Sequence, residues 1–113
     1  MKPGDVVLAR LPLIVGGPIK LRPALLLVSL PGPYQIALLC GISTRLHNIV
    51  PGWDELMKPG DADFVSSKLL KTSVIRLAYL RGVTATEMVG LIGHIDQARL
   101  DRLRQHLSDH LRP

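Results

Sequence analysis

The chain has 113 residues, which is enough for one domain and too few for two. Apolar residues make up 47% of it and charged residues 20%, so it can bury a core and does not have the composition of a disordered protein. Ten glycines and nine prolines would interrupt a helical bundle many times. We therefore predict one compact, β-rich domain over residues 1–113.

The charge balance is basic. Fourteen Lys and Arg residues against nine Asp and Glu residues give a net charge of +5. A small basic domain suits a polyanionic partner, either a nucleic acid or an acidic protein. The chain has only four aromatic residues, so a nucleic-acid surface here would offer few side chains for base stacking.

Cys40 is the only cysteine, and this excludes an internal disulfide and a cysteine-rich metal site. We expect a cytoplasmic protein, since the first residues also lack the long apolar region of a signal peptide. The apolar run 36–40 predicts a buried, unreactive thiol. No charge occurs between residues 23 and 44, but Pro31-Gly32-Pro33 divides this stretch, which predicts a buried hairpin and no membrane span.

Three strands are predicted in the first half of the chain. Residues 5–11 are rich in valine and leucine, and residues 15–20 contain Gly16-Gly17-Pro18 and should form a flexible loop. Residues 23–30 and 34–42 are apolar at successive positions. These two strands should therefore be buried on both faces of a sheet.

The second half begins with a long polar segment. Residues 45–62 are punctuated by Pro51-Gly52 and Pro59-Gly60, which predicts a surface loop of the kind that often carries function. Shorter elements should follow, namely strands at 63–66, 72–77 and 88–95 and a helical turn at 77–80. Gly90 and Gly93 would allow a bulge or a close approach in the last strand.

The end of the chain has the clearest helical pattern. Asp96 is placed to act as the N-cap, and four leucines recur at spacings of three and four residues, at positions 100, 103, 107 and 111. This stripe should close one side of the sheet. The opposite faces carry Arg99, Arg102, Arg104, His106 and His110.

The histidines have structural as well as functional explanations. His106 and His110 lie one helical turn apart, a spacing that could hold a metal ion, but no acid–base motif surrounds them and we expect a solvated helix face. His94 lies in an apolar strand, where a structural histidine is the usual interpretation. His47 begins the long loop and is a candidate for contact with a substrate.

The long loop also contains acidic and aromatic residues. Asp61 and Asp63 lie two positions apart, and we expect them to be solvated. Trp53 is either a platform for stacking or a local packing anchor, and the sequence leaves both open.

Arg22-Pro23 opens the first fully apolar strand, and Ser43-Thr44 ends the second. Antiparallel strands joined by a short turn bring the start of one near the end of the other. The two arms on either side of the turn have nearly equal length, so a guanidinium and two hydroxyls should meet at one end of the sheet. That arrangement is compatible with a functional site and with an ordinary surface.

Five segments in chain order carry a family resemblance: residues 2–8 (KPGDVVL), 20–25 (KLRPAL), 41–44 (GIST), 70–76 (LKTSVIR) and 90–96 (GLIGHID). Together they resemble the MazF/PemK family of toxins from type II toxin–antitoxin systems. The resemblance implies a mainly β fold with a C-terminal helix, an SH3-like β-barrel of the PemK/CcdB type, usually as a homodimer. It also implies an endoribonuclease that cuts single-stranded RNA at short sequences, with no metal or cofactor, and a cognate acidic antitoxin that covers the active groove.

The family's catalytic pair is the Arg of an Arg-Pro motif and a Thr at a strand end, and these positions fall on Arg22 and Ser43. Serine keeps the hydroxyl but loses the methyl group that stiffens χ1, and the adjacent Thr44 could share the role. The loop at 15–20 also lacks the acidic residue that some members carry there. The expected substrate-binding residues are Lys20, Thr44, Arg45 and His47.

In metal-free RNA cleavage the ribose 2′-OH attacks its own 3′-phosphate. The Arg22 guanidinium would stabilise the added negative charge, and Ser43 would donate to or orient the phosphate. Two alternatives are a non-enzymatic toxin of the same fold that binds DNA gyrase, as CcdB does, and a degenerate member that only binds RNA or its antitoxin.

Overall fold

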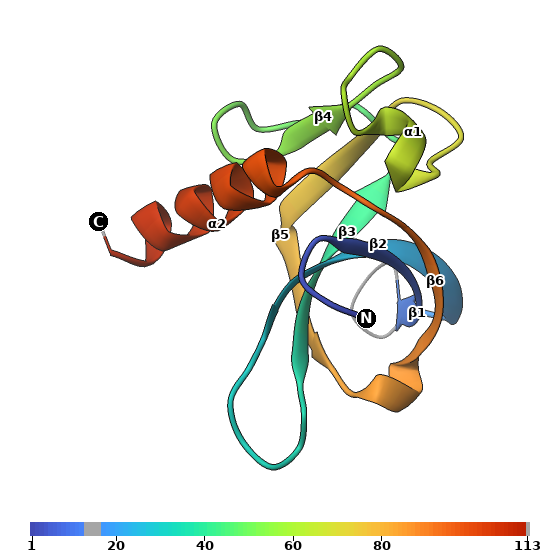
Figure 1. The fold of residues 1–113 in the computed structure, drawn as a ribbon, viewed down its shortest axis with the longest axis vertical. Helices are drawn as coiled ribbons and strands as arrows, with labels where there is room; N and C mark the ends of the chain where they lie inside the picture. Colours follow the sequence, from blue (N-terminus) through green and yellow to red (C-terminus); the bar gives the residue numbers. More distant parts are fainter. Residues whose placement is uncertain (13–16, 113) are drawn as a thin grey trace.

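The computed structural model of this chain describes residues 1–12 and 17–112. Six strands form one antiparallel sheet in the order β4-β5-β3-β2-β1-β6, which curls around itself (Figure 1). The strands are β1 (Asp5–Pro12), β2 (Ile19–Ser29), β3 (Ala37–Ser43), β4 (Glu55–Met57), β5 (Ser73–Val83) and β6 (Met88–His94). The helical elements are α1 (Phe64–Ser67), the short 3-10 helix η1 (Ala85–Glu87) and α2 (Gln97–Leu111). The predicted mainly β fold with a C-terminal helix is confirmed.

The central strands are buried on both faces, as their apolar runs predict. Leu25 and Leu27 of β2 point into one core, and Ala24 and Leu26 point into a second core on the opposite face. Side chains alternate along a strand, so successive apolar residues must serve two different cores. Of the predicted 15–20 loop, residues 15 and 16 lie outside the described residues.

Two predicted elements are wrong. The predicted strand at 63–66 is the single-turn helix α1, stabilised where Ser67 Oγ donates to the Phe64 carbonyl at 2.6 Å. The predicted helical turn at 77–80 is part of the 11-residue strand β5. The pairing of β3 with β5 jumps there from Gly41↔Arg76 to Cys40↔Leu80, so the segment that resembles a turn is an irregularity within the strand.

The helix α2 starts where the sequence predicts but is capped differently. Asp96 occupies the N-cap position without a side-chain hydrogen bond to the helix. Its backbone N–H instead donates to a carboxylate oxygen of Asp63 at 3.1 Å. Leu100 and Leu103 are buried in the first core, whereas Leu111 is exposed. The first half of the leucine stripe therefore closes the core, and the last leucine does not.

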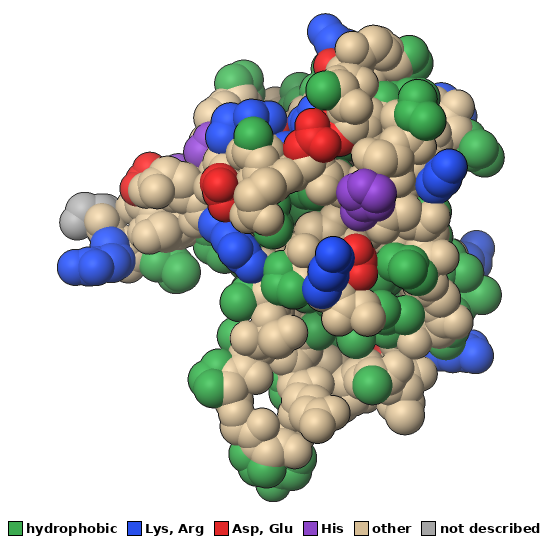
Figure 2. Space-filling model, viewed as in Figure 1, with side chains coloured by type: hydrophobic (Ala, Val, Ile, Leu, Met, Phe, Trp, Pro, Cys, Tyr) green, Lys and Arg blue, Asp and Glu red, His purple; other side chains and the backbone are tan. Residues whose placement is uncertain are grey.

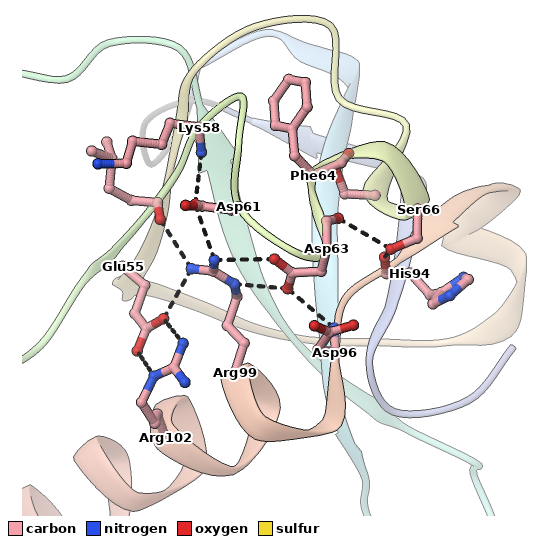
Figure 3. Close-up of polar contacts among 12 residues, drawn as sticks. Glu55, Lys58, Asp61, Asp63, Phe64, Ser66, His94, Asp96, Arg99 and Arg102 are labelled. Atoms are coloured by element: carbon pink, nitrogen blue, oxygen red, sulfur yellow. Dashed lines mark hydrogen bonds and ion pairs between the residues drawn. The ribbon is translucent and has the colours of Figure 1, made fainter.

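A buried ion cluster centred on Arg99 joins α2 to the segment between β4 and α1 (Figure 3). Nε and Nη2 of Arg99 donate to the two carboxylate oxygens of Asp63 at 2.8 and 3.1 Å. Nη1 donates to Glu55 at 3.0 Å, and Nη2 donates to Asp61 at 3.2 Å. Arg99 is only 7% exposed and Asp63 only 2%. The expectation that Asp61 and Asp63 are solvated is therefore wrong at this cluster, and Arg99, expected on a face opposite the leucines, is buried in it.

Pairing between Arg99 and Asp63 outweighs the cost of burying their charges. Burial alone would raise the pKa of Asp63 and lower that of Arg99. Their mutual hydrogen bonds and charges outweigh burial, so the pKa of Asp63 lies below its ordinary value and that of Arg99 lies above it. Arg102 adds a second fork to Glu55, with nitrogen–oxygen distances of 2.9 and 3.0 Å.

The end of β6 packs directly against α1. Ser66 Oγ donates to the His94 carbonyl at 3.0 Å. The His94 side chain is exposed and makes no hydrogen bond within the described residues, so the structural role expected for it is not seen. A side-chain carbon at Gly93 would lie 2.4 Å from the Ser66 carbonyl oxygen. The predicted close approach at this glycine is confirmed. Among the described residues, no helix is long and apolar enough to cross a membrane.

We expect Gly93→Ala to lower the free energy of unfolding by about 2 kcal/mol or more, because the added methyl group overlaps the α1 backbone. Gly90→Ala is the matched control in the same strand, where the nearest atom, on Leu8, would lie at an ordinary 3.8 Å. Denaturant unfolding of both variants measures the difference. Equal stability of the two variants would contradict the packing seen at α1.

Replacing Asp63 with Asn should lower the free energy of unfolding at pH 7 by about 3–5 kcal/mol, since it breaks the buried pair with Arg99. The pKa of Asp63 is lower in the folded protein than in the unfolded chain. Its stabilisation is therefore complete at neutral pH and is lost as the pH falls from about 4 through the folded value. Asp63→Asn should thus lose less stability than the unaltered protein on acidification.

Urea unfolding at pH 7 and along the acid range measures both effects. The control is Asp101→Asn, which removes an equal charge from the exposed side of α2 and should change stability little. A similar loss in the two variants at pH 7 would argue against the ion cluster as a stabilising contact.

Candidate active site

A cavity of about 1000 Å³ opens at the end of the sheet where β2 begins and β3 ends. The predicted site residues that line it are Arg22, Ser43, Thr44, Arg45 and His47. Lys20 is not among the described lining residues; it is exposed on β2, opposite Leu11 of β1. The structure therefore brings the candidate catalytic pair and three of the four expected binding residues into one cavity.

The pairing of β2 with β3 brings the candidate catalytic pair together. Ala24 lies opposite Gly41, and continuing this register by two residues places Arg22 beside Ser43. Both side chains are half-buried at the cavity. The sequence predicts this meeting from the equal arms of the hairpin, and the cavity shows that the two groups share one space.

Arg22 is available for an anion. Its Nε donates to the Leu11 carbonyl at 3.2 Å, which fixes the direction of the side chain. Among residues 1–12 and 17–112, neither Nη1 nor Nη2 makes a hydrogen bond and no carboxylate pairs with Arg22. A guanidinium held by Nε with its terminal nitrogens uncommitted can present a planar fork to a phosphate.

Ser43 is held through its oxygen. Oγ accepts the backbone N–H of Arg45 at 3.1 Å, which leaves the hydroxyl proton free to donate. Thr44 is exposed beside it, so a second hydroxyl is present at the rim of the cavity. The two groups that the sequence singles out thus offer a positive charge and a hydrogen-bond donor to the same space.

Arg76 also lines the cavity, although sequence analysis did not assign it a role. Its Nη2 donates to the carbonyls of Arg45 and His47, at 2.6 and 2.9 Å, and Nη1 lies 3.8 Å from the buried carboxylate of Asp54. The first turn of the long loop is therefore tied to β5. Arg76 is the last residue of the 70–76 segment that resembles the family, and this position is the sequence signal that could have indicated a role for it.

Tyr79 is a second lining residue that the sequence did not single out. Its ring lies against Gly41, where a side-chain carbon would meet ring atoms at 3.2–3.3 Å. Its hydroxyl donates to the Pro12 carbonyl at the end of β1. The glycine is needed for this close contact, and Tyr79 owes its position to the irregular stretch of β5.

Another wall of the cavity is formed by the turn between α1 and β5. It carries Lys68 and Lys71 around Leu70, which is 97% exposed, and all three line the cavity. Lys68 has a positive φ of 61° and ends α1. Basic side chains are also spread over the rest of the surface, as Figure 2 shows for one face.

Two further candidates have structural roles. Cys40 is fully buried, and burial followed by the nearby charge of Asp54 raises the pKa of its thiol, so the predicted buried thiol is confirmed. The Trp53 side chain packs against the first core, and its ring lies 4.5 Å from that of His110. His106 Nδ1 lies 3.1 Å from the Trp53 carbonyl oxygen. These contacts favour the packing anchor over the stacking platform.

The fold and the site together define a small protein with a curled antiparallel sheet and a cavity lined by basic groups and hydroxyls. Residues 2–111 match the sequence model of the PemK-like, MazF-like toxins of type II toxin–antitoxin systems. The chain belongs to this family, which confirms the resemblance carried by its five segments.

A solved structure supports the fold. The Mycobacterium tuberculosis toxin MazF-mt6 aligns with a TM-score of 0.67 and 14% sequence identity, over 95% of this chain and 95% of that one. At this identity the likeness concerns the architecture, and it confirms the predicted MazF-like fold. No curated protein sequence matches the chain.

Proposed function

We propose that this toxin is a metal-independent, sequence-selective endoribonuclease that cuts single-stranded RNA in the cavity between Arg22 and Ser43. The observation that carries the proposal is the uncommitted guanidinium fork of Arg22 in one cavity with the Ser43 hydroxyl. The basic groups around the cavity and the net charge of +5 suit a polyanionic substrate.

The reaction we propose is attack by the ribose 2′-oxygen on the adjacent phosphorus. The new O2′–P bond forms, the P–O5′ bond breaks, the 2′-hydroxyl gives up its proton, and the departing 5′-oxygen gains one. Arg22 stabilises the extra charge that develops on the phosphate oxygens, and Ser43 donates a hydrogen bond to one of them. Thr44, Arg45 and His47 contact the flanking nucleotides, and Lys20 attracts the backbone from outside the cavity.

Membership of this family implies an antitoxin partner. We propose that the antitoxin is acidic and competes with RNA for the same basic face, since both are polyanions. We further propose a cytoplasmic homodimer, in keeping with the free cysteine and the family resemblance.

Cleavage of a single-stranded RNA pool in the presence of a chelator, followed by mapping of the ends, tests the proposal. Arg22→Ala should lower the rate about a hundredfold or more, because a preorganised charge donor is removed. Ser43→Ala should lower it as well, whereas Ser43→Thr should keep it. Arg112→Ala removes the same charge at the exposed end of α2 and should leave the rate unchanged.

RNA that stays intact with the unaltered protein would overturn the nuclease assignment. Binding without cleavage would identify a degenerate binding module. Inhibition of DNA supercoiling by gyrase, with intact RNA, would identify the gyrase-directed alternative.

A further inference from the structure

Asp54 is a buried carboxylate beside the cavity but not among its described lining residues. Its side chain is only 2% exposed. Oδ1 accepts the N–H of Leu77 in β5 at 3.1 Å, and Oδ2 accepts the N–H of Val50 in the loop at 3.0 Å. A buried carboxylate is costly unless it is paired, and here Arg76 Nη1 lies 3.8 Å away. Asp54 therefore holds the loop, β5 and Arg76 in one arrangement.

Arg76 connects Asp54 to the loop through hydrogen bonds. Its Nη2 carries two hydrogens, and both are used, on the carbonyls of Arg45 at 2.6 Å and His47 at 2.9 Å. The guanidinium is planar and rigid, so Asp54 at one terminal nitrogen constrains the other nitrogen as well. The carbonyl group of Arg45 is consequently fixed in place.

The same residue contacts the candidate catalytic hydroxyl. The N–H of Arg45 donates to Ser43 Oγ at 3.1 Å. Asp54, Arg76, Arg45 and Ser43 thus form a chain of contacts in which the first link is an ion pair at 3.8 Å and the other two are hydrogen bonds to the Arg45 carbonyl and from the Arg45 N–H. A serine side chain has three staggered χ1 positions and no methyl group to restrict them, so an external contact is needed to hold its oxygen.

We propose that Asp54 and Arg76 are positioning residues that set the Ser43 hydroxyl for reaction through the Arg45 backbone. The proposal rests on the proposed role of Ser43 in RNA cleavage. It gives Arg22 and Arg76, which both line the cavity, different tasks. The terminal nitrogens of Arg22 remain available to bind the phosphate, whereas Nη2 of Arg76 is occupied by hydrogen bonds to backbone carbonyls. The hydrogen bond from the Arg45 N–H to Ser43 Oγ supplies the rigidity that a threonine at position 43 would gain from its methyl group.

Asp54→Asn and Arg76→Lys test this chain of contacts from Asp54 to Ser43, which we call the relay. Each should lower kcat about tenfold and change KM by no more than about twofold, since the hydroxyl is misplaced while the basic groups that bind RNA remain. Arg76→Lys keeps the charge and loses the fork, so unchanged kcat in this variant would overturn the proposal. Asp101→Asn is the control, because it changes the net charge as Asp54→Asn does, on the exposed side of α2.

A rescue separates positioning from general loosening. Adding Ser43→Thr to Asp54→Asn should restore kcat to within about threefold of the unaltered protein, because the methyl group restricts χ1 without the relay. No recovery of kcat in the double variant would count against the relay, since a general loss of structure cannot be repaired by one methyl group at position 43.

Hydrogen exchange of the Arg45 amide reports on the relay without RNA. This amide bonds to Ser43 and contacts neither Asp54 nor Arg76 directly. We expect it to exchange at least about tenfold faster in both variants while amides in the middle of β2 and β3 keep their rates. Unchanged exchange overturns the proposal. Faster exchange in a protein that never cleaves RNA supports the relay and overturns the proposed function instead. If Asp54→Asn does not fold, the kcat and the Arg45 amide exchange of Arg76→Lys test the proposal.

Discussion

The ion cluster around Arg99 is the constraint on which the arrangement of α2, β4 and α1 depends. One guanidinium satisfies carboxylates of Glu55, Asp61 and Asp63, so α2, β4 and the start of α1 are fixed relative to one another. Removing Arg99 would leave Asp63 buried without a cationic partner, which is far more costly than losing a surface pair. The turn that follows α1 forms a wall of the cavity, so a cluster outside the site determines where that wall stands.

The other half of the site depends on the register of the central hairpin. Because β2 and β3 are buried on both faces, a slip of one residue would exchange the side chains of the two cores, placing Leu25 where Leu26 belongs. Register is therefore strongly specified, and with it the meeting of Arg22 and Ser43. Packing in the interior of the sheet thus sets the geometry of polar groups at its end.

The sequence predicts those parts of the molecule that depend on local pattern. Apolar runs locate β2 and β3, leucine spacing locates α2, and the hairpin arms bring Arg22 to Ser43. It does not predict α1, because a single helical turn is stabilised by the long-range contacts of Asp63 with Arg99 and Asp96. It also does not predict the tasks of Arg76 and Tyr79, since their partners lie 22 or more residues away in the chain.

The distribution of acidic residues explains why a chain of modest net charge has an uncompensated basic cavity. Four of the nine acidic residues, at positions 54, 55, 61 and 63, make the ion pairs with Arg76, Arg99 and Arg102. These acids are used within the protein, and no other ion pair occurs among the described residues. Arg22, Lys68 and Lys71 therefore face the cavity without a neutralising partner in the described part of the chain. The contacts that stabilise the fold thus concentrate positive charge where a polyanion would bind.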